Sequence, residues 1–269
     1  MPRPMRRDLT AAVVALRIGV SQGLSGWTVL AGRCLFYLLI MTVLSALWDK
    51  VAAERVAGAI SLPAGDLVLY VLVTEWITLA LPAVHLRFED DIRSGGLEPH
   101  LLRPKAYLLQ SLAQSLGGTL VRLAALGVTA LAWLAATGRP GLEAAAYLYL
   151  AVLGVLAVTV GMLLYAAAGL CAFWARRILP FQLVIQKLMF LLGGLFAPIS
   201  LYPDWLRKFG EATPFAAHLY WAGVQALQPS GTLFLRAVAW QGLWIMLLSL
   251  LCVALWRAGL AKVLREGGV

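Results

Sequence analysis

Side chains that could do chemistry are few in this sequence and do not form a catalytic set. His85, His100 and His218 have none of the short spacings that bring two histidines onto one metal ion. The phosphate-binding pattern G-x-x-x-x-G-K-[ST] is missing, as are a nucleophile elbow and the zinc motif HExxH. We therefore predict that the chain is not an enzyme, binds no metal or cofactor, and has no P-loop ATPase of its own.

Charges inside apolar runs are more informative. A charge near the centre of a membrane helix costs about 2.5–3.5 kcal/mol on insertion scales, so it needs a partner or a wet cavity. Glu75 and Arg122 both lie near mid-depth of adjacent predicted spans. We interpret them as an ion pair or, alternatively, as a polar point on a substrate path. Arg33 lies near the end of its span and is expected to extend to the interface.

A second polar group lies in the inner half of the predicted fifth span. It consists of Gln182, Gln186 and Lys187. The three side chains could line a vestibule, or Lys187 could extend its ammonium group to the membrane interface.

Small residues recur in the predicted fourth span, at Gly154, Gly161 and Gly169. Their near-helical spacing favours close helix packing. We expect that packing within the subunit, with a dimer contact as the alternative.

Composition excludes an ordinary soluble domain. Hydrophobic residues make up 61% of the chain, against about 45–50% in soluble proteins. The net charge of +9 could indicate a nucleic-acid partner, but the basic residues lie between apolar runs, without a basic stripe interleaved with aromatics. We predict an all-α, multi-span membrane protein that does not bind nucleic acid.

Six apolar runs approach or exceed the roughly 20 residues that a membrane-spanning helix needs. They cover residues 27–48, 67–84, 108–136, 147–174, 179–197 and 238–256. Lys and Arg are more frequent in the segments on the N-terminal side of the membrane, so the positive-inside rule predicts both termini in the cytoplasm. We expect one transmembrane domain over residues 1–269.

Two segments outside these runs are also expected to be helical. Residues 9–20 follow Arg3, Arg6 and Arg7 and have the pattern of an amphipathic helix at the cytoplasmic interface. Residues 198–237 combine several prolines with aromatic residues. That composition favours broken, partly re-entrant helices on the outer side, before the last span.

The most polar part of the chain is an island at residues 87–105, between the second and third predicted spans. Its charged residues and histidine are Arg87, Glu89, Asp90, Asp91, Arg93, Glu98, His100, Arg103 and Lys105. Only 13% of the whole chain is charged, so this island must lie in water. The charge bias places it in the cytoplasm, and its mixed signs suit a contact with another protein.

Two motifs carry a resemblance to a known family. The run FEDDIRSGGLEPHLLRP, residues 88–104, is similar to the segment that follows the second span in type-2 ABC exporter permeases. The run GGLFAPISLYPDWL, residues 193–206, followed by TPF at 213–215, resembles their fifth span and outer region. The six spans and the amphipathic N-terminus agree, so the resemblance covers the whole chain. The doubled glycine at 95–96, with Pro99, departs from the pattern and shortens the expected coupling helix.

The resemblance implies a permease subunit of an ATP-driven exporter in the bacterial cytoplasmic membrane. Cytosolic ATPase subunits would bind ATP and Mg, and a second permease, the same chain or a sister chain, would complete a path lined by spans one, two and five. A cytoplasmic coupling helix would contact the ATPase. The residues implied in that coupling are Phe88, Glu89, Asp90, Asp91, Ile92, Arg93, Leu97, Leu101, Leu102, Arg103, Arg176 and Arg177. Acidic residues in a first helical turn and nearby leucines suit a docking helix.

Other functions stay open on the sequence alone. Glu75 and Arg122 could serve an ion- or proton-coupled secondary transporter. A lipid-modifying membrane enzyme would fit the composition but lacks a catalytic set. The island could also be a solvated loop that binds nothing.

Overall fold

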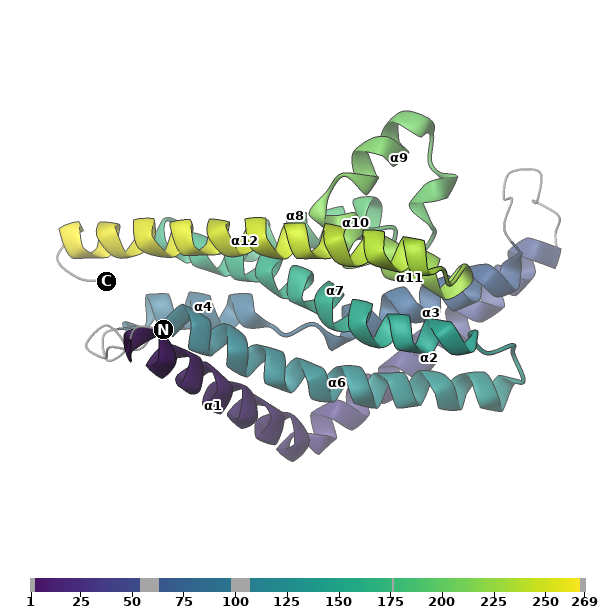
Figure 1. Ribbon diagram of the computed structural model, residues 1–269, viewed down its shortest axis with the longest axis horizontal. Coiled ribbons are helices and arrows are strands. Elements are labelled where there is room, and N and C mark those ends of the chain that lie inside the picture. The colour runs from purple at the N-terminus through teal and green to yellow at the C-terminus, as the bar shows by residue number, and fades with distance from the viewer. Residues whose placement is uncertain (1–2, 54–62, 98–106, 176, 267–269) are drawn as a thin grey trace.

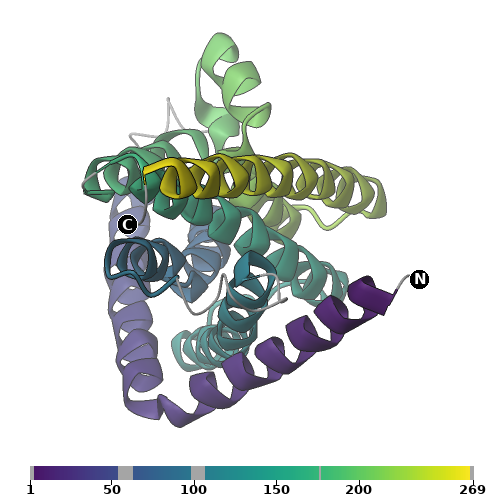
Figure 2. The same ribbon diagram turned by 90° about the vertical axis from the view of Figure 1, so that its left-hand side faces the viewer.

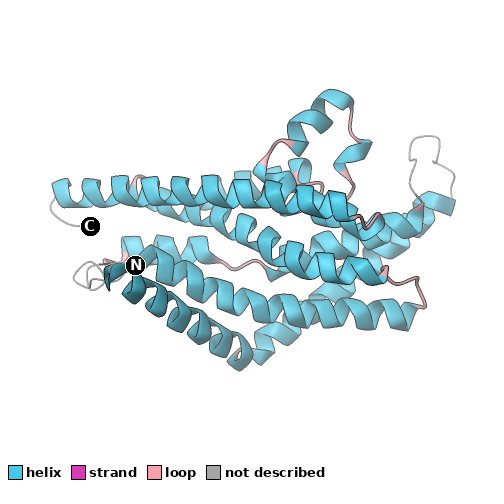
Figure 3. Cartoon of the chain, viewed as in Figure 1, coloured by secondary structure: helices cyan, strands magenta, loops and turns pink. Residues whose placement is uncertain are grey.

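The computed structural model describes residues 3–53, 63–97, 107–175 and 177–266. These residues form helices joined by short loops, and none of them lies in a β-strand (Figure 3). In chain order the elements are α1 (Arg3–Ser25), α2 (Trp27–Ala53), α3 (Ala64–Ala80), α4 (Val84–Arg93), α6 (Tyr107–Thr137), α7 (Ala144–Leu170), η2 (Cys171–Phe173), α8 (Leu179–Leu192), η3 (Ile199–Leu201), α9 (Asp204–Glu211), α10 (Pro214–His218), α11 (Tyr220–Leu227) and α12 (Gly231–Glu266). The expected all-α fold is confirmed.

Within the described residues, five helical segments are long and apolar enough to cross a membrane. They are Trp27–Val51, Gly65–Arg93, Tyr107–Thr137, Ala144–Phe173 and Gly231–Arg265. They correspond to the first four predicted spans and the sixth. The chain is therefore a multi-pass membrane protein.

The predicted fifth span, residues 179–197, is helical only over α8, which has 14 residues. At a rise of about 1.5 Å per residue it is about 21 Å long, shorter than the roughly 30 Å hydrocarbon core. Two glycines end it. Gly193 is the C-cap, and Gly194 has a φ of +67°, which side-chain-bearing residues rarely adopt.

The second spanning segment is broken into α3 and α4 by Leu81, Pro82 and Ala83. Pro82 has no N–H and its ring clashes with the preceding turn, so a helix cannot run through it unbroken. Leu81 is extended, with φ −57° and ψ 138°, as residues before proline usually are. The helical segment then continues to Arg93, ten residues past the break, and takes in the first part of the charged island.

Helix α7 is a central element, and its glycines allow neighbours to approach closely. A Cβ on Gly154 would lie 2.5 Å from the Trp76 ring, and one on Gly161 would lie 2.6 Å from the His218 ring. A Cβ on Gly169 would lie 2.8 Å from the Cα of His85. The three glycines therefore serve packing within the subunit, as the preferred prediction stated.

Helix α1 lies obliquely across α6 on one side of the molecule (Figures 1 and 2). Glycines make this crossing close: a Cβ on Gly19 would lie 1.9 Å from the carbonyl oxygen of Gln114. On the facing helix, a Cβ on Gly117 would lie 2.1 Å from the carbonyl oxygen of Leu16. The predicted N-terminal helix is present, and its backbone packs directly against the backbone of α6.

Short helices fill the segment between α8 and α12, as the prolines predicted. The turn after α8 is held by α3, because Tyr70 donates a hydrogen bond to the Gly194 carbonyl at 2.7 Å and Thr74 donates to the Leu195 carbonyl at 2.7 Å. Helix α11 packs on α3, where Gly223 leaves room for the Tyr70 ring. Helix α9 stands away from the bundle (Figure 1).

The start of α1, the helix α4 and the end of α12 lie at the same end of the molecule (Figure 1). The charged part of the second segment therefore lies at the same end of the molecule as the first residues of α1 and the last residues of α12.

The α1–α6 crossing yields a stability prediction. Gly19→Ala should lower the melting temperature of the detergent-purified protein, because the new methyl group meets a backbone carbonyl that has no rotamer to change. Overpacking of this kind costs about 1–3 kcal/mol. Gly32→Ala in α2 is the control, since no atom lies within 4 Å of its Cβ position. Equal melting temperatures for the two variants would show that the close crossing does not exist.

Candidate functional site

Helix α4 is bound to the rest of the chain along one face. Its residues Val84, His85, Phe88 and Ile92 are buried, and the helix packs against α7 and η2. Phe88 is 0% exposed, and Leu97, just beyond the helix, is 1% exposed. The apolar half of the island is therefore part of the chain's own core.

Glu89 links α4 to the start of α8. Its Oε1 accepts a hydrogen bond from the backbone N–H of Ile178 at 3.2 Å and one from Arg93 Nη1 at 3.3 Å. Ile178 is the N-cap residue of α8, so the Glu89 carboxylate satisfies one of the N–H groups that a helix start leaves free. A displacement of α4 would therefore act directly on α8.

Asp91 links α4 to the start of α6. Its carboxylate accepts a hydrogen bond from the Tyr107 hydroxyl and lies 3.8 Å from Arg87 Nε. Asp90, between the two engaged acids, is exposed. On the described part of the chain, Asp90 is thus the island carboxylate that faces outward.

A model of the ABC-2 family transporter proteins matches residues 64–267, well over half of the chain. The chain belongs to the ABC-2 transporter family. The match begins with α3 and runs into α12, so it contains the broken segment, α4 and the short helices. No curated protein and no solved structure matches the chain.

The coupling residues implied by the family resemblance fall into three groups in this ABC-2 protein. Phe88, Ile92 and Leu97 are buried in the core. Their side chains hold α4 in place and do not offer an apolar surface to a partner. Glu89 and Asp91 are half-buried and bind other helices, whereas Asp90 and Arg93 are exposed. Leu101, Leu102, Arg103 and Arg176 lie outside the described residues, and Arg177 is exposed.

The free carbonyl groups on the α3 side of the break are satisfied by two arginines from other helices. Arg33 of α2 donates to the Leu79 carbonyl, and Arg122 of α6 donates through Nε to the Ala80 carbonyl at 2.9 Å. No backbone N–H of the described residues donates to either carbonyl. Cations at a helix C-terminus also interact favourably with its dipole. The two arginines thus replace helical hydrogen bonds that the carbonyls of Leu79 and Ala80 lose at the break.

The predicted Glu75–Arg122 ion pair does not form among the described residues. No carboxylate of the described residues lies within 4.0 Å of Arg122, whose Nη2 donates to the Thr119 hydroxyl at 2.7 Å. The reason is the break, because it leaves carbonyls without helical donors inside an apolar segment, and Arg122 donates to one of them instead of pairing with Glu75. Glu75 is buried, 5% exposed.

The polar group of α8 does not gather into one site. Lys187 is exposed and lies over the Phe190 ring, with Nζ 5.7 Å from the ring centre. Gln182 and Gln186 are half-buried on the same helix. The geometry places Lys187 on the surface of α8.

Sequence reasoning missed the partners that position the island. Tyr107 is separated from Asp91 by the undescribed part of the chain, and Ile178 contributes only a backbone N–H. Neither has a side-chain pattern that marks it. Pro82 was the available signal for the break, because proline within an apolar run interrupts a helix.

The arginine caps yield a stability prediction. Arg122→Met should lower the free energy of unfolding by about 1.5–3 kcal/mol, the usual worth of hydrogen bonds from a charged donor. Glu75→Gln should cost much less, because no ion pair is lost. Thermal unfolding in detergent measures both. Equal, large losses for both variants would instead indicate the ion pair, since removing either partner of a buried pair strands the other.

Proposed function

We propose that this ABC-2 family protein is the membrane-spanning permease subunit of an ATP-driven exporter and is itself non-catalytic. A second permease completes the translocation path, and cytosolic ATPase subunits bind ATP and Mg. The observation that carries the proposal is α4, a helix with an outward acidic and basic face built onto a membrane segment and tied to three other helices.

Those ties make α4 a suitable element for transmitting force. Its buried face packs on α7, Glu89 holds the start of α8, and Asp91 holds the start of α6. Packed interiors transmit displacement because they are dense and have few voids. A partner that moves α4 would therefore move the ends of three helices together.

The partner would contact the charged outer face of α4. Asp90 is exposed, and the side chains of Arg87 and Arg93 are 41% and 51% exposed. Glu89 and Asp91 act within the chain and position the helix. The coupling roles of Leu101, Leu102, Arg103, Arg176 and Arg177 stay predictions that follow from the family resemblance.

The membrane topology follows from the same proposal. The end of the molecule that carries α4 and both terminal helices faces the cytoplasm of a bacterial cell, in agreement with the positive-inside rule. Helix α8 and the turn after it act as the fifth of six crossings, and the short helices that follow are re-entrant from the outer side. This arrangement is supported by Tyr70 and Thr74 of α3, whose hydroxyl groups donate hydrogen bonds to the carbonyls that follow α8.

One observation favours a second candidate, an ion- or proton-coupled secondary transporter. Glu75 is a buried carboxyl group in a spanning segment and has no ion pair with the described residues. Buried acids of this kind serve as proton carriers in some transporters. Transport by the purified chain alone in liposomes, driven by a pH gradient and abolished by Glu75→Gln, would favour this candidate.

Asp90→Lys tests the ATPase contact. The variant should insert and fold normally, because Asp90 is exposed and its carboxylate has no described partner. It should recover at least about tenfold less ATPase on affinity purification from its native host, since opposed like charges cost several kcal/mol at an interface. Quantitative mass spectrometry of the purified complex measures the ratio of ATPase to permease.

The matched control is Asp204→Lys on α9, which makes the same charge change at a side chain that is 81% exposed. It should co-purify the ATPase as the wild type does. Recovery of the ATPase with Asp90→Lys at the level of this control would overturn the proposed contact. Complete absence of an ABC ATPase from the wild-type complex would overturn the proposed function.

A further inference from the structure

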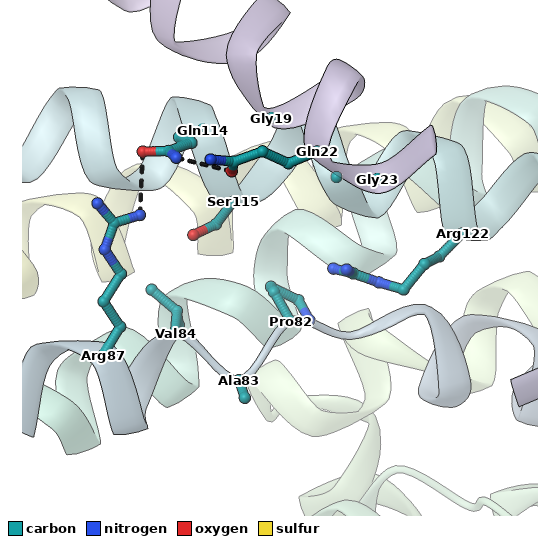
Figure 4. A pocket seen from close by; sticks show the side chains of 11 residues that line it. Gly19, Gln22, Gly23, Pro82, Ala83, Val84, Arg87, Gln114, Ser115 and Arg122 are labelled. Carbon is teal, nitrogen blue, oxygen red and sulfur yellow. Dashed lines mark hydrogen bonds between the residues drawn. The ribbon is translucent and has the colours of Figure 1, made fainter. Parts of the chain in front are cut away.

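A cavity of about 260 Å³ lies beside the break between α3 and α4. Helices α1, α4 and α6 and the break itself form its walls (Figure 4). Its polar lining consists of Gln22, Arg87, Gln114, Ser115 and Arg122, and no Asp or Glu belongs to the lining. The cavity is therefore lined by two cations and several neutral hydrogen-bonding groups.

Arg122 reaches into this space from α6, and Arg87 stands on the opposite side, on α4 (Figure 4). Arg122 uses Nε and Nη2 for the Ala80 carbonyl and the Thr119 hydroxyl. Its remaining nitrogen, Nη1, has no acceptor among the described residues. Two N–H donors of a fixed guanidinium group are thus left for a ligand.

Arg87 is held at the edge of the cavity by a chain of side-chain amides. Its Nη1 donates to Gln114 Oε1 at 3.1 Å, and Gln114 Nε2 donates to Gln22 Oε1 at 2.8 Å (Figure 4). The chain joins α4, α6 and α1 across the cavity mouth. The walls are therefore connected before any ligand enters.

The break leaves hydrogen-bond donors on its other side. The backbone N–H groups of Ala83, Val84 and His85 have no acceptor among the described residues, whereas the carbonyls of Leu79 and Ala80 are capped by arginines. Ala83 and Val84 line the cavity. Free N–H groups at the start of a helix attract anions, and here they lie beside two arginines. An anionic ligand in the cavity could accept hydrogen bonds from these free N–H groups.

The surface next to the cavity is apolar. Val14, Ile18 and Gln22 are four residues apart on α1, so they form one row along the helix. Gln22 lines the cavity, while Val14 and Ile18 are 49% and 47% exposed. These exposed apolar side chains lie beside the cavity, where acyl chains can pack against α1.

We propose that this cavity binds the phosphate group of an anionic membrane lipid, whose acyl chains pack against the exposed apolar side chains of α1. Arg87 and Arg122 contact the phosphate oxygens, and the first N–H groups of α4 complete the site. The proposal goes beyond the permease function and does not depend on an ATPase partner. A free phosphate ion would satisfy the same polar groups but would not use the apolar row.

Thermal unfolding of the purified full chain in a neutral detergent tests the site, followed by the fluorescence of its 10 tryptophans. Dioctanoyl phosphatidylglycerol should raise the melting temperature in a saturable way, because a ligand of the folded state stabilises it by mass action. Dioctanoyl phosphatidylcholine and inorganic phosphate at equal concentrations should give clearly smaller shifts. A shift with inorganic phosphate that equals the lipid shift would overturn the lipid as the ligand.

Variants locate the effect. Arg87→Gln should weaken the apparent lipid affinity at least about tenfold through loss of a charge-assisted contact. Ser115→Leu should weaken it similarly by filling the cavity without a change of charge. Arg93→Gln is the control, since Arg93 is also an exposed arginine of α4 in an i,i+4 pair but does not line the cavity. Each variant's melting temperature without lipid reports its folding. Wild-type affinity in both cavity variants would overturn the proposal.

Discussion

The break between α3 and α4 is the constraint on which the rest of the structure depends. A membrane interior offers no water to a free N–H or C=O group, so an interrupted helix must find its partners inside the protein. Arg33 and Arg122 supply donors to the last carbonyls of α3. Their positions on α2 and α6 in turn bring those two helices to the same level of α3. One proline thus determines where two half-buried cations lie.

The same break gives α4 its own set of neighbours. An unbroken helix would carry α4 in line with α3, whereas the extended residues at the break let it pack on α7. Gly169 makes this possible, because a side chain there would collide with the backbone of His85. The charged half of the segment is therefore attached to the bundle by packing and hydrogen bonds, in addition to its covalent connection.

The sequence predicted the elements better than their contacts. Hydropathy located five spanning segments, and the prolines at 198–229 indicated the short helices, because both signals are local. Composition predicted a fifth span over residues 179–197, whereas the helix there ends at Leu192, before Gly193 and Gly194. The Glu75–Arg122 pair was inferred from opposite charges at similar depth. The position of Arg122 along its span does not reveal that it donates a hydrogen bond to the Ala80 carbonyl. That carbonyl is free only because another helix, α3, ends at the break.

The three consecutive acids of the island have different roles in the structure, although they are neighbours in the sequence. In the sequence, Glu89, Asp90 and Asp91 form one block of negative charge. In the structure the first holds α8, the third holds α6, and only Asp90 faces outward. Under the proposed function, a partner would therefore meet one carboxylate flanked by arginines rather than an acidic patch. Recognition of such a partner would then depend on the position of a few charges on a fixed helix, and Glu89 and Asp91 would contribute by holding that helix in place.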